Sequence, residues 1–304
     1  MYKVIFMIIN IDTLLAVFIF IIGLCIGSFS NVVIYRLKNL EKKKREIFFS
    51  RSFCPKCKHK LGFFDLVPFF SWVFLLGKCR YCKARISPQY PLAEISMGIL
   101  FLFSFFWSSV SVYDLSQGDF QNIPKLLSAL FTSFVMVVIT AYDILYMEIP
   151  DEIMLPSIMI LALLATIRSI LALLEIETQF IDPLYMPRFL DAFVGLAIPV
   201  LFFIFQILIS GGAWIGGGDL RIAAFMGLLL GWKKTLAALA LGYCLGSVVG
   251  LILIFIYKKI HKKKAKESLK MRIPFGPFLA FGTLASYFYG DWLVHLYVKF
   301  LFDY

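Results

Sequence analysis

The stretch VMVVITAYDILYMEIPD at residues 135–151 decides the fold class of the chain. An apolar run from Val135 to Ala141 is followed almost at once by Asp143, and Pro150 ends the helical geometry that the run favours. A carboxylate at or near bilayer depth is costly, so an aspartate in such a run indicates a functional group with a partner. The stretch therefore predicts a membrane helix that carries a chemical site near one end.

The whole chain has the composition of a protein that crosses a membrane several times. Of its 304 residues, 61% are hydrophobic and only 16% are charged, and the mean hydropathy is +0.85. A soluble protein of this length would need far more charged surface, because soluble domains carry roughly 25% charged residues. We therefore predict an all-α polytopic membrane protein.

Long apolar stretches mark the membrane spans. A helix needs about 20 apolar residues to cross a bilayer, and this length predicts about eight transmembrane helices. They lie at residues 12–34, 91–110, 125–143, 153–172, 190–210, 220–232, 235–257 and 277–301. The first stretch has no small-residue cleavage pattern after it, so we expect a retained helix. The sixth is short, which suits a helix that begins at a re-entrant glycine loop.

Basic residues are concentrated in two segments. The net charge is +11, and 14 of the 30 Lys and Arg residues lie at residues 36–85, with eight more at residues 258–272. In a membrane protein such segments indicate cytoplasmic loops that contact anionic lipids. We expect membrane lipids, and no nucleic acid, as partners.

The same distribution predicts how the spans are oriented. If residues 36–90 are cytoplasmic, alternation of the spans places the loops that adjoin Asp143 and Asp219 on the cytoplasmic side as well. Only Lys233 and Lys234, in a very short outer turn, oppose this orientation. We therefore expect both aspartates at the cytoplasmic membrane face.

Asp219 follows three glycines, Gly216–Gly218, and opens an apolar stretch. Taken alone, it could equally be a helix N-cap after a glycine turn. Two carboxyl groups brought close, however, cannot both ionise, so one becomes an acid while the other stays a base. Such a pair activates water against a peptide bond without a metal or a nucleophile. We therefore predict an intramembrane aspartyl protease with Asp143 and Asp219 as its catalytic residues.

Other polar groups near these aspartates have simpler interpretations. Glu148 and Asp151 lie in the loop beyond the apolar run and are expected to be solvated acids or, for Asp151, a helix N-cap. Residues 274–280 enter the last span from the same side, either as extended backbone near the carboxylates or as a plain helix start with proline in its first turn. The histidines are scattered, and no His-Glu-x-x-His motif is present.

Four of the six cysteines form two pairs with 21 residues between them. Two short knuckles at this separation can present four thiolates tetrahedrally to zinc, and such a site is structural because no ligand position stays open. A redox dithiol and iron are the alternatives, although a reducing cytoplasm favours a metal over disulfides. Nearby Lys and Arg residues are expected to lower the thiol pKa values. The predicted zinc ligands are Cys54, Cys57, Cys79 and Cys82.

Taken in order, these motifs resemble the bacterial type IV prepilin peptidases, the leader peptidase/N-methyltransferase family. The resemblance covers nearly the whole chain. Its elements are GSFSNVVIYR at 27–36, both cysteine pairs, DLVPFFSW at 65–72, YPLAE at 90–94, the Asp143 segment, Gly-x-Gly-Asp at 216–219 and Pro-Phe-Gly-Pro at 274–277. The two aspartate motifs are also similar to the wider presenilin-type proteases, which lack the cysteine insert.

The resemblance implies a specific function. Members of the family cleave the leader from type IV prepilins and pseudopilins at the cytoplasmic face of the bacterial inner membrane, and then N-methylate the new terminus with S-adenosylmethionine. We expect a first transmembrane helix at 1–35, a zinc-binding cytoplasmic insert associated with methyl transfer at 36–90, and an aspartyl peptidase bundle at 91–304.

One position departs from the family pattern. Gln89 stands where an arginine usually precedes the Tyr-Pro dipeptide, so a peptidase without methyl transfer is an alternative, and a proton-coupled transporter is a more distant one. No glycine-rich loop after a strand locates an S-adenosylmethionine site. Arg36 and Glu94 could serve methyl transfer, but helix-boundary packing and lipid-headgroup contact explain them nearly as well.

Overall fold

The computed structural model describes residues 2–39, 51–174, 189–261 and 273–302. Across these residues the chain is mostly helical, and its only β-type pairing is two isolated bridges, Phe53 with Lys60 and Lys78 with Arg85. The predicted all-α fold is confirmed. The chain divides into two compact units, residues 1–141 and residues 142–304. The finer division at residues 35 and 90 stays a prediction.

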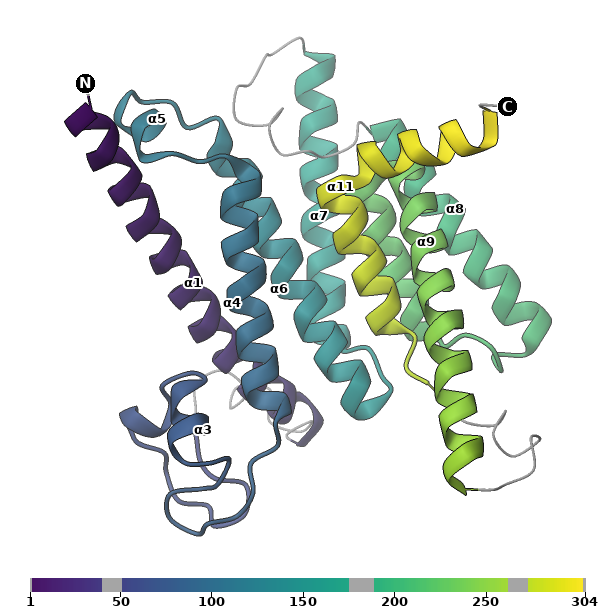
Figure 1. Cartoon of the computed structure of the whole chain (residues 1–304). Coiled ribbons are helices and arrows are strands. Elements are labelled where there is room, and N and C mark those ends of the chain that lie inside the picture. Colours follow the sequence, from purple (N-terminus) through teal and green to yellow (C-terminus); the bar gives the residue numbers. More distant parts are fainter. Residues whose placement is uncertain (1, 40–50, 175–188, 262–272, 303–304) are drawn as a thin grey trace. The chain divides into compact units, whose positions relative to one another are not determined.

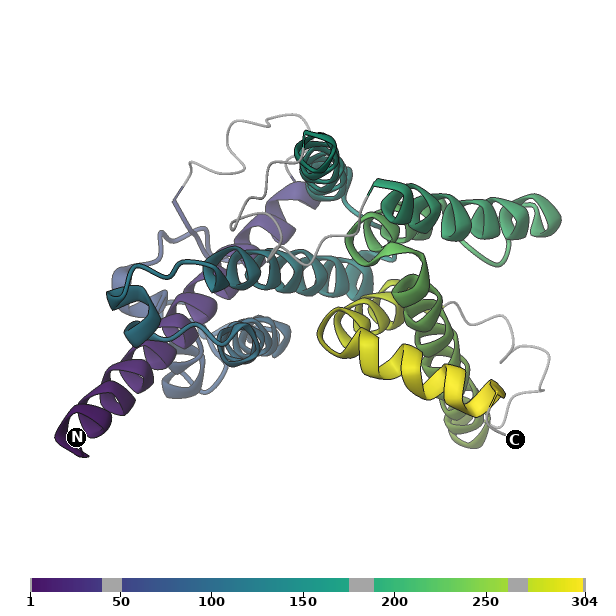
Figure 2. The same cartoon turned by 90° about the horizontal axis from the view of Figure 1, so that it is seen from above.

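The first unit is built on two long helices that pack against each other. α1 (Tyr2–Asn39) runs beside α4 (Gln89–Ser108) in both views (Figures 1 and 2). A Cβ on Gly27 would lie 2.7 Å from the Cα of Glu94, so the absence of a side chain there lets the two backbones approach closely. This contact places Glu94 against the cytoplasmic half of α1 predicted above.

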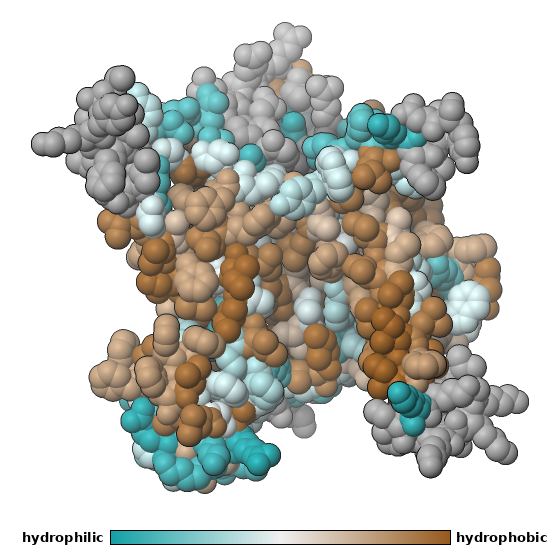
Figure 3. Space-filling view, in the orientation of Figure 1, coloured by the Kyte–Doolittle hydropathy of each residue, from teal (hydrophilic) through white to brown (hydrophobic). Residues whose placement is uncertain are grey.

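Between these two helices the chain forms a small insert. It contains a 3-10 turn, η1 (Phe63–Asp65), and one short helix, α3 (Phe70–Phe74). Figure 3 shows apolar residues covering the flanks of the helices, while hydrophilic residues gather at the tip of the insert. Two helices follow α4: the short α5 (Val112–Ser116) and the long α6 (Asn122–Tyr146). The last residues of α6, from Tyr142 on, belong to the second unit.

The second unit is a helical bundle centred on α9. It comprises α7 (Asp151–Leu173), α8 (Phe189–Ser210), α9 (Gly217–His261) and α11 (Gly276–Phe302). α9 packs against both α8 and α11, and the green and yellow helices adjoin in both ribbon views (Figures 1 and 2). The sixth and seventh predicted spans are the two parts of α9, which is broken at Gly231 where φ is 71°.

Six of the described helices are long and apolar enough to cross a membrane: α1, α4, α6, α7, α8 and α9. They cover seven of the eight predicted spans. The eighth, residues 277–301, forms α11, which is interrupted at Tyr289 and carries charged residues in its second half. The chain is therefore a multi-pass membrane protein. Lys234, which opposed the predicted orientation, forms an ion pair with Asp291 at 2.8 Å.

Candidate functional site

Asp143 lies near the end of α6 and is only 5% exposed. The backbone N–H of Gly276 donates a hydrogen bond of 2.8 Å to Asp143 Oδ2. Gly276 is the first residue of α11, where N–H groups have no partner within the helix and the helix dipole favours a carboxylate. The Pro-Phe-Gly-Pro motif thus starts a helix whose free N–H holds Asp143.

Asp219 is held at the start of another helix. It is the third residue of α9, and its Oδ2 accepts the N–H of Gly216 at 3.2 Å while its own N–H donates to the Gly216 carbonyl. This pair of bonds resembles half of a capping box, so Asp219 is not the N-cap residue itself. The carboxyl groups of Asp219 and Asp143 are close enough to interact electrostatically within the second unit.

Two contacts hold the loop after α6 against the start of α9. A Cβ on Gly218 would lie 2.6 Å from Ile149 Cγ1, so only glycine permits this approach. Arg221 forms an ion pair with Asp151, the first residue of α7. Glu148 is exposed, as predicted, whereas Asp151 is paired rather than simply solvated. Together the contacts bring the two aspartate-bearing helix ends to one place.

Sequence reasoning missed a third polar group beside this site. Tyr243 of α9 lies close enough to Asp219 to interact with it electrostatically, and its hydroxyl donates to Gln206 Oε1 of α8 at 2.9 Å. The Tyr243 ring also contacts Phe275, the residue before Gly276, with the ring centroids 5.0 Å apart. The sequence held one signal for this group. Gln206 is a polar amide within a long apolar stretch, and such a residue usually has a polar partner.

The four paired cysteines come together in the first unit. Their sulfur atoms all lie within 4.8 Å of one another, and Cys54 Sγ and Cys82 Sγ are 3.9 Å apart. A tetrahedral zinc site with Zn–S bonds of about 2.3 Å separates its sulfur atoms by about 3.8 Å, so the cluster fits zinc. The predicted grouping is therefore present.

The two knuckles share one backbone geometry. In the first, the Lys58 N–H donates to the Cys54 carbonyl at 2.9 Å, and in the second the Lys83 N–H donates to the Cys79 carbonyl at 3.0 Å. Both lysines have positive φ, 60° and 56°. Burial acts to raise the pKa of Cys54, but the N–H groups of Cys57 and Lys56, together with the thiols of Cys57 and Cys79, lower that pKa to about 7. The N–H of His59 acts to lower the pKa of Cys57, but that pKa is instead raised to about 11, because burial and the neighbouring sulfur atoms of Cys54 and Cys82 disfavour a second negative charge. The lowering at Cys54 therefore comes from the backbone and the neighbouring thiols and not from the predicted lysine charges.

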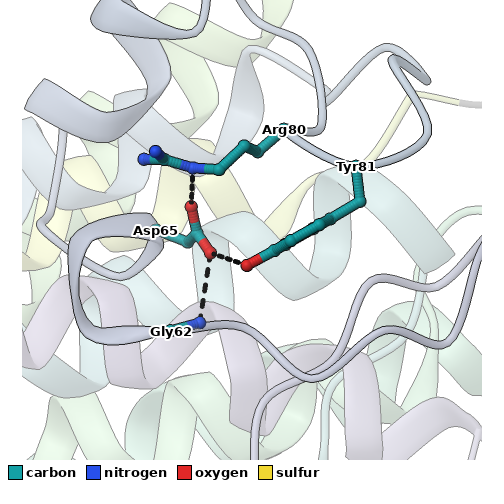
Figure 4. A network of polar contacts seen from close by, with 4 residues as sticks. All are labelled: Gly62, Asp65, Arg80 and Tyr81. Carbon is teal, nitrogen blue, oxygen red and sulfur yellow. Dashed lines mark hydrogen bonds and ion pairs between the residues drawn. The ribbon is translucent and has the colours of Figure 1, made fainter.

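Asp65 ties the segment between the knuckles to the second knuckle (Figure 4). Its carboxylate accepts Arg80 Nε at 2.6 Å, the Tyr81 hydroxyl at 3.2 Å and the Gly62 N–H at 3.1 Å. Burial acts to raise the pKa of Asp65, but these donors lower it below the ordinary value. The carboxylate is therefore a charged structural link at neutral pH.

The remaining candidates lie together in the first unit. Arg36 is 2% exposed and Glu94 is 7% exposed, and both line one cavity. Gln89 is the first residue of α4, and its N–H donates to Ser87 Oγ at 3.3 Å. Their burial disfavours lipid-headgroup contact as the explanation of Arg36 and Glu94.

Two family models match the chain in succession. Residues 21–108 match the bacterial peptidase A24 N-terminal domain, and residues 130–251 match the type IV leader peptidase family. The first match contains the cysteine cluster, Arg36 and Glu94, and the second contains Asp143 and Asp219.

Curated relatives match over most of their length. The chain is 29% identical over 305 residues to a prepilin leader peptidase/N-methyltransferase of Stutzerimonas stutzeri, with 92% of each chain covered. It is 28% identical to the protein of the same name in Bacillus subtilis, covering 92% of this chain and 97% of that protein. A Myxococcus xanthus relative, also so named, is 31% identical over 79% of this chain and 64% of its own. No solved structure matches.

Proposed function

The chain belongs to the type IV leader peptidase family, and from this premise we propose that it cleaves the leader peptide of prepilins or pseudopilins and then N-methylates the new amino terminus. The observation that carries the peptidase assignment is the meeting of Asp143, held by the Gly276 N–H, with Asp219 in one compact unit. The relatives are named for both activities, and the two family models support the peptidase.

Asp143 and Asp219 act on a water molecule held between them. One carboxylate removes a proton from the water as it attacks the scissile carbonyl carbon, and the other, protonated, donates a hydrogen bond to the developing oxyanion. The proton then passes to the leaving amine as the C–N bond breaks. The Gly276 N–H keeps one oxygen of Asp143 occupied, which leaves its second oxygen for the water.

Cys54, Cys57, Cys79 and Cys82 hold a structural zinc ion in this proposal. Four thiolate ligands leave no position for substrate, so the ion acts by fixing the insert. The methyl group comes from S-adenosylmethionine. The site faces the cytoplasm of a cell whose inner membrane the protein spans, and the positive charge of the segments 36–85 and 258–272 supports this orientation.

Mass spectrometry of a co-expressed prepilin tests both activities together. A prepilin from cells with the protein is expected to lose its leader and to gain 14 Da at the new N-terminal residue, roughly the mass that a methyl group adds in place of hydrogen. An uncleaved prepilin would contradict the proposal, and a cleaved but unmethylated one would support the alternative of a peptidase alone.

A further inference from the structure

A cavity of about 330 Å³ lies in the first unit, between the end of α1, the insert and the start of α4. Its size falls at the lower end of the range of small-molecule sites, roughly 300–1,000 Å³. Three separate parts of the chain supply its polar walls: Asn31 and Arg36 from α1, Trp72 from the insert, and Tyr90 and Glu94 from α4. The cavity contains neither of the aspartates assigned to cleavage.

Glu94 is a buried carboxylate without a cationic partner among the described residues. Its Oε2 accepts the N–H of Phe69 at 2.7 Å, and Ser28 supplies a second hydrogen bond. Phe69 is held in an unusual backbone conformation, with φ of 61°, next to this bond. An ionised carboxylate in such a place is stabilised by a positively charged ligand.

Arg36 supplies the opposite charge within the same cavity. It is 2% exposed, and its Nη2 donates to the carbonyl of Arg51 at 3.3 Å. A guanidinium has five N–H donors in a planar fork that matches a carboxylate. The lining of the cavity includes the aromatic rings of Tyr35, Trp72 and Tyr90, and such rings attract a cation or stack on a purine.

Both reactants of N-methylation carry the charges that these walls complement. The new amino terminus is an ammonium group, and S-adenosylmethionine has a sulfonium centre, an adenine ring and an amino-acid carboxylate. We propose that the cavity is the methyl-transfer site, in which Arg36 binds the donor's carboxylate and Glu94 binds the ammonium of the processed substrate. This inference rests on the proposed methyltransferase function and assigns it to particular residues.

In this methyl transfer, Glu94 accepts the proton that the ammonium group must lose. The ammonium gives one proton to the Glu94 carboxylate, which later passes it to solvent. The freed nitrogen lone pair forms the N–C bond to the methyl carbon, and the C–S bond breaks with its electron pair moving to sulfur. The products are a methylated ammonium and a neutral thioether.

Photo-crosslinking locates the donor independently of turnover. Purified wild-type protein is irradiated with tritiated S-adenosylmethionine, and the labelled peptides are sequenced. We expect label in peptides that line the cavity, within residues 28–36, 52–56 or 71–94, and competition by unlabelled S-adenosylhomocysteine. Label confined to the second unit would overturn the assignment. If the protein labels in the cavity but never methylates a prepilin, the proposed function fails while the donor site stands.

Two substitutions separate the assigned roles. Glu94→Gln is expected to lower methylation by about tenfold or more, since it removes a charged hydrogen bond, while binding of S-adenosylhomocysteine by calorimetry changes little. Arg36→Gln is expected to weaken that binding by about tenfold or more. Glu94→Asp should restore part of the methylation rate.

Leader cleavage and zinc content serve as controls for folding in both variants. Glu94→Gln protein that methylates at the wild-type rate, or that loses S-adenosylhomocysteine binding with its zinc intact, would overturn the role given to Glu94. If Arg36→Gln protein binds S-adenosylhomocysteine as tightly as the wild type, the role given to Arg36 is overturned. If either variant loses zinc and cleavage together, it has failed to fold, and the crosslinking result on wild-type protein decides the location.

Discussion

The N–H of Gly276 and the carboxylate of Asp143 form a contact that admits no side chain between them. The hydrogen bond from Gly276 to Asp143 Oδ2 is 2.8 Å, and a Cβ on Gly276 would lie 2.5 Å from the same oxygen. The second aspartate, Asp219, is close enough to Asp143 for the two carboxyl groups to interact electrostatically. The start of α11 therefore fixes where the carboxyl group of Asp143 lies relative to its partner.

Gly276→Ala is expected to reduce leader cleavage by about 100-fold, since a shift near 1 Å in a reacting group can cost that much. Gly250→Ala is the matched control, because a Cβ there would meet nothing nearer than 3.8 Å. Cleavage of a purified prepilin in detergent, followed by gel shift, measures both. Equal activity in the two variants would show that the Gly276 contact does not position Asp143.

The close approach of Gly218 to Ile149 is tested by Gly218→Ala, and Gly217→Ala on the adjacent residue is its control. A Cβ on Gly218 would clash with Ile149, whereas one on Gly217 would have nothing within 4 Å. We expect Gly218→Ala to lose most cleavage activity because α9 and the loop after α6 must separate, and Gly217→Ala to keep most of it. The same gel assay decides, and an effect in the reverse order would contradict this packing.

Metal analysis tests the cysteine cluster. Purified protein is expected to hold one zinc ion per chain, and Cys54→Ser and Cys79→Ser are each expected to lose it, because three thiolates bind the ion far less tightly. Cys244→Ser, which changes a thiol of α9 outside the cluster, should keep its zinc. Cleavage is expected to survive in part in the cluster variants. Wild-type protein without any zinc would refute the metal assignment.

Asp65→Asn should loosen the insert, since the variant loses the charge that Arg80, Tyr81 and the Gly62 N–H hold. The pKa of Asp65 is lowered, so its stabilising contribution is complete above the ordinary pKa of about 3.9 and is lost only as pH falls through the lower folded-state value. Limited proteolysis of the insert should be faster in the variant by the same factor at pH 6 and pH 8. A factor that changes between these pH values would contradict the charge state assigned to Asp65.

Local signals in the sequence predicted the helices and the grouping of the four cysteines, and they singled out the two candidate aspartates. Apolar length identified the spans, and the Cys-x-x-Cys spacing encodes each knuckle within a few residues. The prediction of a short turn at Lys233 and Lys234 was less accurate. There α9 is broken at the single residue Gly231, whose positive φ only glycine adopts freely, and Lys234 pairs with Asp291 of α11.

Contacts between distant residues could not be predicted in this way. The bond from Gly276 to Asp143 joins residues 133 apart, and that between Tyr243 and Gln206 joins residues 37 apart. Neither separation follows a helix or strand period, so the first contact is revealed only by the packing of α6 with α11, and the second only by that of α8 with α9. The cavity between Arg36 and Glu94 likewise depends on how α1 packs on α4.

The most direct test of the two-aspartate mechanism is cleavage of a purified prepilin by Asp143→Asn and Asp219→Asn protein. Each variant is expected to lose at least about 100-fold in cleavage rate, the contribution typical of general acid–base groups. Glu148→Gln, which neutralises an exposed acid in the loop beyond Asp143, should cleave at the wild-type rate. Wild-type cleavage by either aspartate variant would contradict the mechanism.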